Sequence, residues 1–277
     1  LGLSGLLWVL RTRPAHEPSG DEIVATATWD ALIFSTVLVS VNLLYLLFCW
    51  IQFSYLFAGA QGTLPAGFSY AEYARRGFLE LSLVTLLNIG IVSCGVYCVE
   101  QRNATANKFA RLMLSLLVLQ SLVILASSFT RLSLYESFYG YTYARLFART
   151  MIVIMGVILA LLFARTWRHN FPFWKSTLLA LLICYIGLNY FNIDRFIAVK
   201  NVERYHKTSN LDFQYLSSLS HEAVPVMVDL ADGKNPDMAQ FFNRELLQRK
   251  SNLEEHQAFP EFNLSRHTAL KMLSSRR

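Results

Sequence analysis

Long stretches without a charged residue are the feature that most constrains how this chain can fold. Residues 31–71 contain no Asp, Glu, Lys or Arg, and shorter charge-free stretches cover 81–99, 112–130, 150–164 and 176–193. A helix rises about 1.5 Å per residue and the hydrocarbon core of a bilayer is about 30 Å thick, so roughly 20 apolar residues cross it. The sequence therefore predicts an all-α fold, a polytopic transmembrane helix bundle with a small helical C-terminal tail domain.

Five transmembrane helices are predicted, and the lipid bilayer is the first expected partner. They cover residues 31–57, 78–99, 110–131, 146–165 and 174–192. Residues 1–10 are apolar but too short to span, and we interpret them as the end of a truncated preceding helix. A soluble bundle is the alternative, but buried soluble helices usually keep a polar stripe. The predicted spans are apolar all round except for single residues such as Asn42, Asn88 and Gln120.

Charge is distributed unevenly along the chain. Residues 31–191 carry fifteen charged side chains, whereas the shorter stretch 192–277 carries eleven acidic and twelve basic ones. Residues 193–277 therefore predict a soluble or membrane-peripheral helical tail. The balanced signs and the lack of a basic stripe exclude nucleic-acid binding. Because the tail is small for a core of its own, we expect it to pack on the membrane helices or on a protein partner.

The first half of the tail carries two helix signals. Ile193, Phe196 and Ile197 recur at helical spacing and predict an amphipathic helix over residues 192–206. Ser209, with Asp212 three positions on, predicts a cap for a second helix over residues 211–219.

The second half of the tail predicts two further helices. Asn235-Pro236 favours a helix start, because Pro is suited to the first helical position. The helix would run over residues 236–256 and carry one apolar face, made of Met238, Phe241, Phe242, Leu246 and Leu247. A last helix is predicted over residues 264–274.

Basic residues in the loops give a weak signal for orientation. The loops preceding the first, third and fifth spans carry eight Lys and Arg, and the other two carry five. The positive-inside rule then places the tail outside the cytoplasm, although counting the basic residues at the start of the tail removes the preference. We expect an extracytoplasmic tail.

The first of three polar clusters precedes the second predicted span. Glu72, Arg76 and Glu80 lie at i, i+4 and i+8, so a helix places them on one face, with Arg75 beside them. Glu80 lies at the expected membrane boundary, where an ionisable group is usually paired or functional. The alternative is an interfacial anchor, with arginines at the lipid head groups.

Two further clusters lie on the same side of the membrane by the alternation of the spans. The second has Arg131, Tyr135, Glu136, Tyr139 and Arg145, and the third has Asp194 and Arg195. Together the clusters predict a polar site at the membrane surface, in which a carboxylate can act as a base and arginines can hold phosphate. An aromatic interfacial loop is again the alternative.

Other chemistry has no support in the sequence. There is no Walker A motif, no G-x-G-x-x-G and no G-x-S-x-G. Cys94 and Cys98 lie one helical turn apart, but no second Cys or His pair is near enough in sequence to complete a metal site. No catalytic residue, metal or cofactor is therefore predicted.

Five segments of the chain resemble a known family. They are YAEYARRGFLEL (70–81), RLSLYESFYGYTYARLFA (131–148), NIDRFIAVKNVERY (192–205), LDFQYLSSLSHEAVPVMVDL (211–230) and FNLSRHTAL (262–270). In this order they resemble bacterial multi-pass membrane proteins grouped as domain of unknown function 4173, relatives of the 4153 group. The resemblance covers roughly residues 30–275 and implies a bacterial inner-membrane protein with further helices before Leu1. It implies no reaction and no catalytic residues.

Three functions remain open. A non-enzymatic sensor, scaffold or assembly factor fits the small tail and the absence of catalytic motifs, and we favour it. A transporter component predicts polar groups at mid-membrane and broken helices, but no predicted span contains Pro. A membrane enzyme acting on a lipid-linked or envelope substrate would use the polar surface site.

Overall fold

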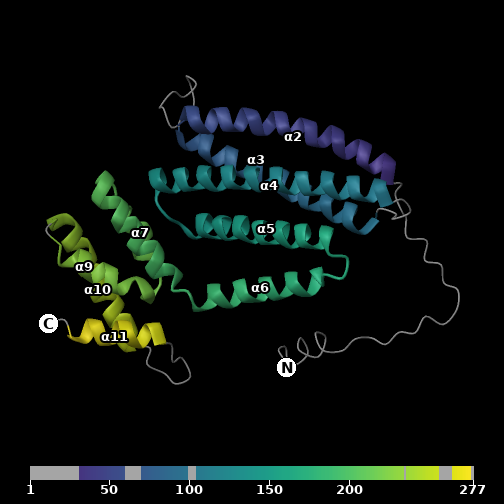
Figure 1. Cartoon of the computed structure of the whole chain (residues 1–277). Coiled ribbons are helices and arrows are strands. Elements are labelled where there is room, and N and C mark those ends of the chain that lie inside the picture. Colours follow the sequence, from purple (N-terminus) through teal and green to yellow (C-terminus); the bar gives the residue numbers. More distant parts are fainter. Residues whose placement is uncertain (1–30, 60–69, 99–103, 234, 256–263, 276–277) are drawn as a thin grey trace, which may run out of the picture. The chain divides into compact units, whose positions relative to one another are not determined.

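The computed structural model describes residues 31–59, 70–98, 104–233, 235–255 and 264–275. Within these ranges the chain is all-α and contains no strand. The interpretation of residues 1–10 falls outside them. The long apolar helices are α2 (Ala31–Gly59), α3 (Tyr70–Cys98), α4 (Ala104–Tyr139), α5 (Tyr143–Trp167) and α6 (Phe173–Tyr190), shown in Figure 1. All five are long and apolar enough to cross a membrane.

The chain divides into two compact units. The first, here the membrane unit, contains the described parts of Leu1–Gly67, Arg76–Phe129 and Ile152–Ile183. The second, here the tail unit, contains those of Phe68–Arg75, Thr130–Met151 and Cys184–Arg277. Helix α4 has 36 residues and is thus about 54 Å long, well beyond the thickness of a bilayer core. Its last ten residues belong to the tail unit, as do the first nine residues of α5.

Amide side chains join the helices of the membrane unit. The Asn42 amide group on α2 donates to the Met113 carbonyl oxygen on α4 at 3.1 Å, and Gln120 Nε2 donates to the Asn42 carbonyl oxygen at 3.1 Å. Asn88 Nδ2 on α3 donates to Ser121 Oγ on α4 at 2.9 Å. Small polar side chains commonly hold membrane helices together in this way. The amide groups of Asn42, Asn88 and Gln120 therefore contribute to the packing between helices.

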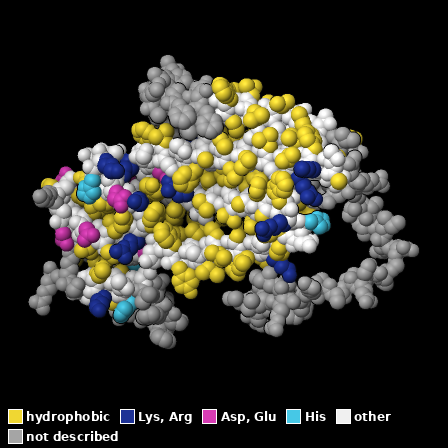
Figure 2. Space-filling view, viewed as in Figure 1, with side chains coloured by type: hydrophobic (Ala, Val, Ile, Leu, Met, Phe, Trp, Pro, Cys, Tyr) yellow, Lys and Arg dark blue, Asp and Glu magenta, His cyan; other side chains and the backbone are white. Residues whose placement is uncertain are grey.

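The outside of the membrane unit is apolar. Trp50, Leu83 and Trp174 are 76%, 65% and 70% exposed. Figure 2 shows hydrophobic side chains over much of the visible face of α2–α6, whereas the acidic side chains in view gather over the tail helices. A continuous apolar surface of this kind is not stable in water and is covered by lipid. The chain is a multi-pass membrane protein.

The tail unit has a hydrophobic core. Its helices are α7 (Ile193–Thr208), α8 (Phe213–Ser218), the 3₁₀ helix η1 (His221–Ala223), α9 (Val224–Ala231), α10 (Pro236–Glu255) and α11 (Leu264–Ser275). Ile197, Leu216, Met227 and Phe242 are at most 1% exposed and belong to one cluster of buried residues. The tail therefore has more core than its length suggests, because α9 supplies a short apolar helix that the sequence signals did not reveal.

Two local expectations for the tail are wrong. Asp212, not Ser209, caps α8: its side chain accepts the Tyr215 backbone N–H at 2.9 Å. Ser209 instead ends α7 in a left-handed conformation with φ 53°. Leu247 does not share the buried face of α10, since it is 69% exposed. The start of α10 is confirmed, because Asn235 Oδ1 accepts the Asp237 N–H at 3.2 Å.

Candidate functional site

The turn between α4 and α5 is the centre of the polar site. Gly140 follows the last residue of α4, with φ 80°, and its N–H donates to the Glu136 carbonyl oxygen at 2.8 Å. A left-handed glycine is a common way to end a helix. A Cβ atom at Gly140 would also collide with Asn201 Oδ1 on α7. Both the backbone angle and the space beside it therefore require glycine here.

A buried ion pair joins α4 to α5 close to this turn. Glu136 on α4 is fully buried and pairs with Arg149 on α5. Arg149 also donates to Ser133 Oγ at 3.0 Å. Because a charge out of water is costly unless it is paired, Glu136 and Arg149 hold the α4–α5 hairpin in one register.

Arg145 is held by aromatic rings and by the turn. Its guanidinium carbon lies 4.4 Å from the centre of the Tyr135 ring and 5.9 Å from that of Tyr139. It also donates to the Gly140 carbonyl oxygen. This cation–π arrangement places the predicted Arg145, Tyr135 and Tyr139 in one group.

Polar side chains of helix α7 form hydrogen bonds with the turn between α4 and α5. Asn201 Oδ1 accepts the Tyr141 N–H at 2.9 Å, and its Nδ2 donates to the Tyr141 carbonyl oxygen at 2.9 Å. Arg204 donates to the Phe138 carbonyl oxygen at 3.0 Å and to that of Asn210 at 2.9 Å. Burial lowers the pKa of Arg204 from its ordinary value. The Asn201 side chain thus satisfies both the backbone N–H and the backbone carbonyl of Tyr141.

Asp194 on α7 provides a second set of contacts between the α4–α5 hairpin and the tail helices. It is 7% exposed and accepts hydrogen bonds from the Tyr143 hydroxyl and from Ser220 Oγ. The Tyr143 backbone N–H donates to the Tyr215 hydroxyl at 3.2 Å. Burial raises the pKa of Tyr215 above its ordinary value.

The structure brings together the second and third predicted clusters. Glu136, Arg145, Tyr135 and Tyr139 lie in the same unit as Asp194. Asp194 binds the hydroxyl of Tyr143, which lies on α5, the helix that also carries Arg145. Arg131 is half-buried on α4, whereas Arg195 on α7 is exposed.

The residues of the first cluster all lie on α3, as a helical ladder requires, but they divide between the two units. Arg75 belongs to the tail unit and Glu80 to the membrane unit, and both side chains are exposed. The side chains of Glu72 and Arg76 lie outside the described part of the chain. The shared site of three clusters therefore remains a prediction for this first member.

Sequence reasoning missed several members of the network, although signals for some were present. Asp194, Ile197, Ala198 and Asn201 are all buried, at i, i+3, i+4 and i+7 of α7. That spacing marks Asn201 as part of the buried face. Arg149 follows Arg145 by one turn on α5, so the same reasoning finds it. Ser220 has no comparable signal, because it approaches Asp194 only through the tertiary fold.

A second cluster of polar contacts lies in the tail, around Arg249 on α10. Arg249 donates to the backbone carbonyl oxygens of Leu219, at 2.9 Å, and of Ser217, and it pairs with Glu245 at 2.9 Å. His221 lies nearby, and burial, with Arg249 and Arg266 as further causes, lowers its pKa. Within the described residues no group of three His, Cys, Asp or Glu side chains is placed to hold a metal ion.

The tail unit also contains an open groove of about 580 Å³. Its apolar lining includes Val199, Val202 and Leu230, from α7 and α9. Glu203 and Asp229 lie at the same groove with exposed side chains, and Glu203 pairs with Lys200 at 2.7 Å, which leaves Asp229 as the negative charge available to a partner. The groove therefore offers an apolar surface beside negative charge.

Comparison with known proteins places the chain in a family. A family model described as Domain of unknown function (DUF4153) matches residues 1–230. No curated protein and no solved structure matches the chain. The match covers all five membrane helices and the polar contacts around Gly140, and it does not extend to the 4173 group, so that part of the resemblance stays a prediction. The chain thus belongs to the DUF4153 family of proteins.

Proposed function

We propose that this protein is a non-enzymatic membrane scaffold, whose tail unit binds a partner protein and is fastened to the α4–α5 hairpin. The observation that carries the proposal is the use of the polar cluster. Glu136 is fully buried against Arg149, Arg145 is stacked on Tyr135, and Asp194 binds Tyr143 and Ser220. These side chains hold the protein's own elements together, which is the work of a structural joint.

The two other functions receive less support from the same contacts. An enzyme at the membrane surface needs a carboxylate that a substrate can reach, and Glu136 and Asp194, the carboxylates of the second and third clusters, are 0% and 7% exposed. A transporter needs polar groups facing a pathway, and Asn42, Asn88 and Gln120 donate hydrogen bonds between helices instead.

The groove of the tail unit is the proposed place for the partner. Its apolar lining suits a hydrophobic side chain, and Asp229 attracts a neighbouring positive charge. We propose a protein segment that presents an apolar residue beside Lys or Arg. This commits the tail to a protein partner rather than to lipid or nucleic acid.

Photo-cross-linking in native membranes tests the scaffold. A photoreactive amino acid replaces Val199, which is 37% exposed in the groove, or, as the control, Leu247, which is 69% exposed on α10. We expect a discrete protein adduct from position 199 only, and we expect Asp229→Lys to reduce it. Adducts with lipid alone, or adducts unchanged by Asp229→Lys, would contradict the proposal.

We further propose that the protein resides in the bacterial inner membrane with its tail outside the cytoplasm. The loop charges and the resemblance to bacterial membrane proteins support this placement. A reporter fused after Arg277, active only on one side of the membrane, tests it. Activity of a cytoplasmic reporter would contradict the proposed orientation.

A further inference from the structure

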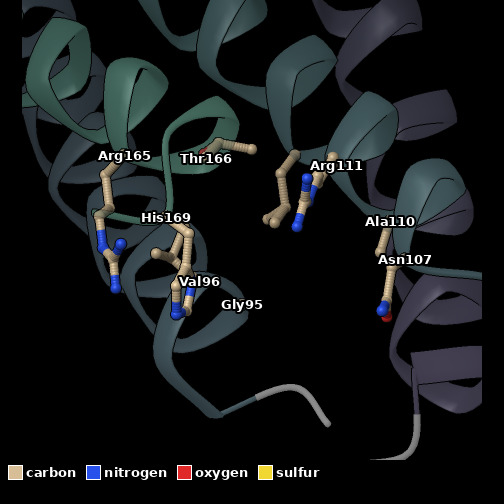
Figure 3. Close-up of a pocket in the computed structure, with 9 residues that line it drawn as sticks. Gly95, Val96, Asn107, Ala110, Arg111, Arg165, Thr166 and His169 are labelled. Carbon is tan, nitrogen blue, oxygen red and sulfur yellow. The ribbon is translucent and has the colours of Figure 1, made fainter. Parts of the chain in front are cut away.

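A basic pocket lies at the end of the membrane unit where α3 ends, α4 begins and α5 ends. Arg111 and Asn107 come from the first turns of α4, whereas Arg165 comes from the last turn of α5 and His169 from the residues after it. Figure 3 shows Arg165 and His169 on one side of the opening and Ala110 and Asn107 on the other. The chain distance between the two groups shows that the fold, not a local motif, brings them together.

The pocket has the size and charge of a site for one small anion. Its cavity of about 40 Å³ holds about three waters, since one water needs roughly 10–15 Å³ of such space. None of its described lining residues is acidic. Arginine forks match the oxygens of phosphate, and an amide and an imidazole add further hydrogen-bond donors.

Neighbouring contacts hold the two walls of the pocket in position. The Arg165 guanidinium carbon lies 5.5 Å from the centre of the Tyr97 ring on α3, which orders its side chain. Trp167 Nε1 donates to Ser115 Oγ at 2.9 Å, so the end of α5 is joined to α4 one turn beyond Arg111. The donors are therefore ordered in advance, and less conformational entropy is lost when a ligand binds.

Its place on the helices gives the pocket access to lipid head groups. Gly95 lies three residues before the end of α3, and Asn107 lies three residues after the start of α4. Ends of membrane helices lie at the interface, where phosphates of phospholipids are concentrated. Tyr97, Phe173 and Trp174 form a cluster of rings in the same unit, with 6.2 Å between the centroids of Tyr97 and Trp174. Such aromatic clusters are typical of the same depth.

We propose that this pocket binds the phosphate group of an anionic phospholipid, with Arg111 and Arg165 as its main ligands and His169 and Asn107 as further donors. The site belongs to the membrane unit and is independent of the scaffold function proposed for the tail. A free phosphate shares the same chemistry, so the test has to separate a lipid phosphate from a soluble one.

Native mass spectrometry of the delipidated full-length protein measures the binding. The probes are phosphatidylglycerol, phosphatidylcholine and inorganic phosphate. We expect phosphatidylglycerol to bind, and Arg111→Gln and Arg165→Gln each to weaken it roughly tenfold, the effect of losing one charge-assisted hydrogen bond. Arg168→Gln is the matched control, because it removes the same charge from an exposed residue outside the pocket lining.

Two further comparisons keep the outcome interpretable. Arg111→Lys retains the charge and should lose less affinity than Arg111→Gln, which excludes a general folding defect as the cause. Competition by millimolar inorganic phosphate would support the pocket but assign it to a soluble ligand. Equal losses in all three Gln variants, or equally tight binding of phosphatidylcholine, would overturn the proposal.

Discussion

The membrane unit and the tail unit use polar side chains in opposite ways. In the membrane unit a few amides, such as Asn42 and Asn88, bond one helix to the next inside an apolar environment. In the tail unit charged residues make the contacts: Glu136 pairs with Arg149 and joins α4 to α5, and Asp194 on α7 binds Tyr143 on α5 and Ser220 before η1. The comparison shows that amides join the apolar helices of the membrane unit, whereas charged side chains join α4, α5 and α7 in the tail unit.

The tail core should give the largest effect on stability. Phe242→Ala removes a ring that is 0% exposed, and we expect it to lower the free energy of unfolding by about 3–5 kcal/mol. Leu247→Ala, on the exposed side of the same helix, should change it by about 0.5 kcal/mol or less. Thermal unfolding of the full-length protein in detergent measures both. Equal effects would show that α10 does not bury the face assigned to it.

Breaking the buried ion pair should come next. Arg149→Met leaves the fully buried Glu136 without its partner charge and should cost about 3 kcal/mol. Lys200→Met breaks the exposed pair with Glu203, at 2.7 Å, and should destabilise the protein much less, because solvent screens an exposed ion pair. The same unfolding measurement applies. If Lys200→Met lowered the free energy of unfolding as much as Arg149→Met, the buried ion pair would be no more important for stability than the exposed one.

Removing the hydrogen bonds of amide side chains within the membrane unit should lower the free energy of unfolding by less. Asn42→Leu removes the bond to the Met113 carbonyl oxygen and should cost about 1 kcal/mol, since interhelical hydrogen bonds in membranes are individually modest. Asn189→Leu is the control, because Asn189 is exposed and its side chain donates to a carbonyl oxygen of its own helix, that of Tyr185, at 2.8 Å. Unfolding in detergent compares the two. A loss above about 3 kcal/mol for Asn42→Leu would give this amide a larger role than packing.

The smallest expected effect is a dependence on pH in the tail. The folded pKa of His221 lies below its unfolded value near 6.5, so the folded state favours the neutral ring. Stability from this group is therefore full above pH about 6.5 and falls as the pH drops toward the lower folded pKa. His221→Gln should reduce the loss of stability between pH 7 and pH 5, whereas His206→Gln, at an exposed residue of α7, should not. Identical acid profiles for the two variants would contradict this role.

Hydropathy predicts the membrane helices well because each span is a local property of the chain. The 19 charge-free residues of 112–130 alone predict that α4 crosses a bilayer. Its extension to Tyr139 is less visible, because Arg131 and Glu136 read as a loop until their tertiary partners are known. Helix α9 was missed for a different reason: eight residues are too few to show a period beside Pro225.

The sequence predicts which charged residues belong to the candidate site, but not which residues they contact. The sequence places Glu136, Arg145 and Asp194 on one side of the membrane, and the structure joins them through residues outside the predicted clusters. Asn201 and Ser220 lie 60 and 26 positions from their partners Tyr141 and Asp194. Contacts at such separations follow from the packing of α7, α8 and η1, which no local pattern encodes.

A double-mutant cycle at the hydrogen bond between Tyr143 and Asp194 asks whether the polar cluster is a joint. The free energy of unfolding of the full-length protein is measured for Tyr143→Phe, Asp194→Asn and the double variant. A joint predicts a coupling energy of about 0.5–3 kcal/mol, because each change removes the same bond. Additive effects, with both single variants as stable as the parent, would show that the cluster does not hold the tail helices to the hairpin.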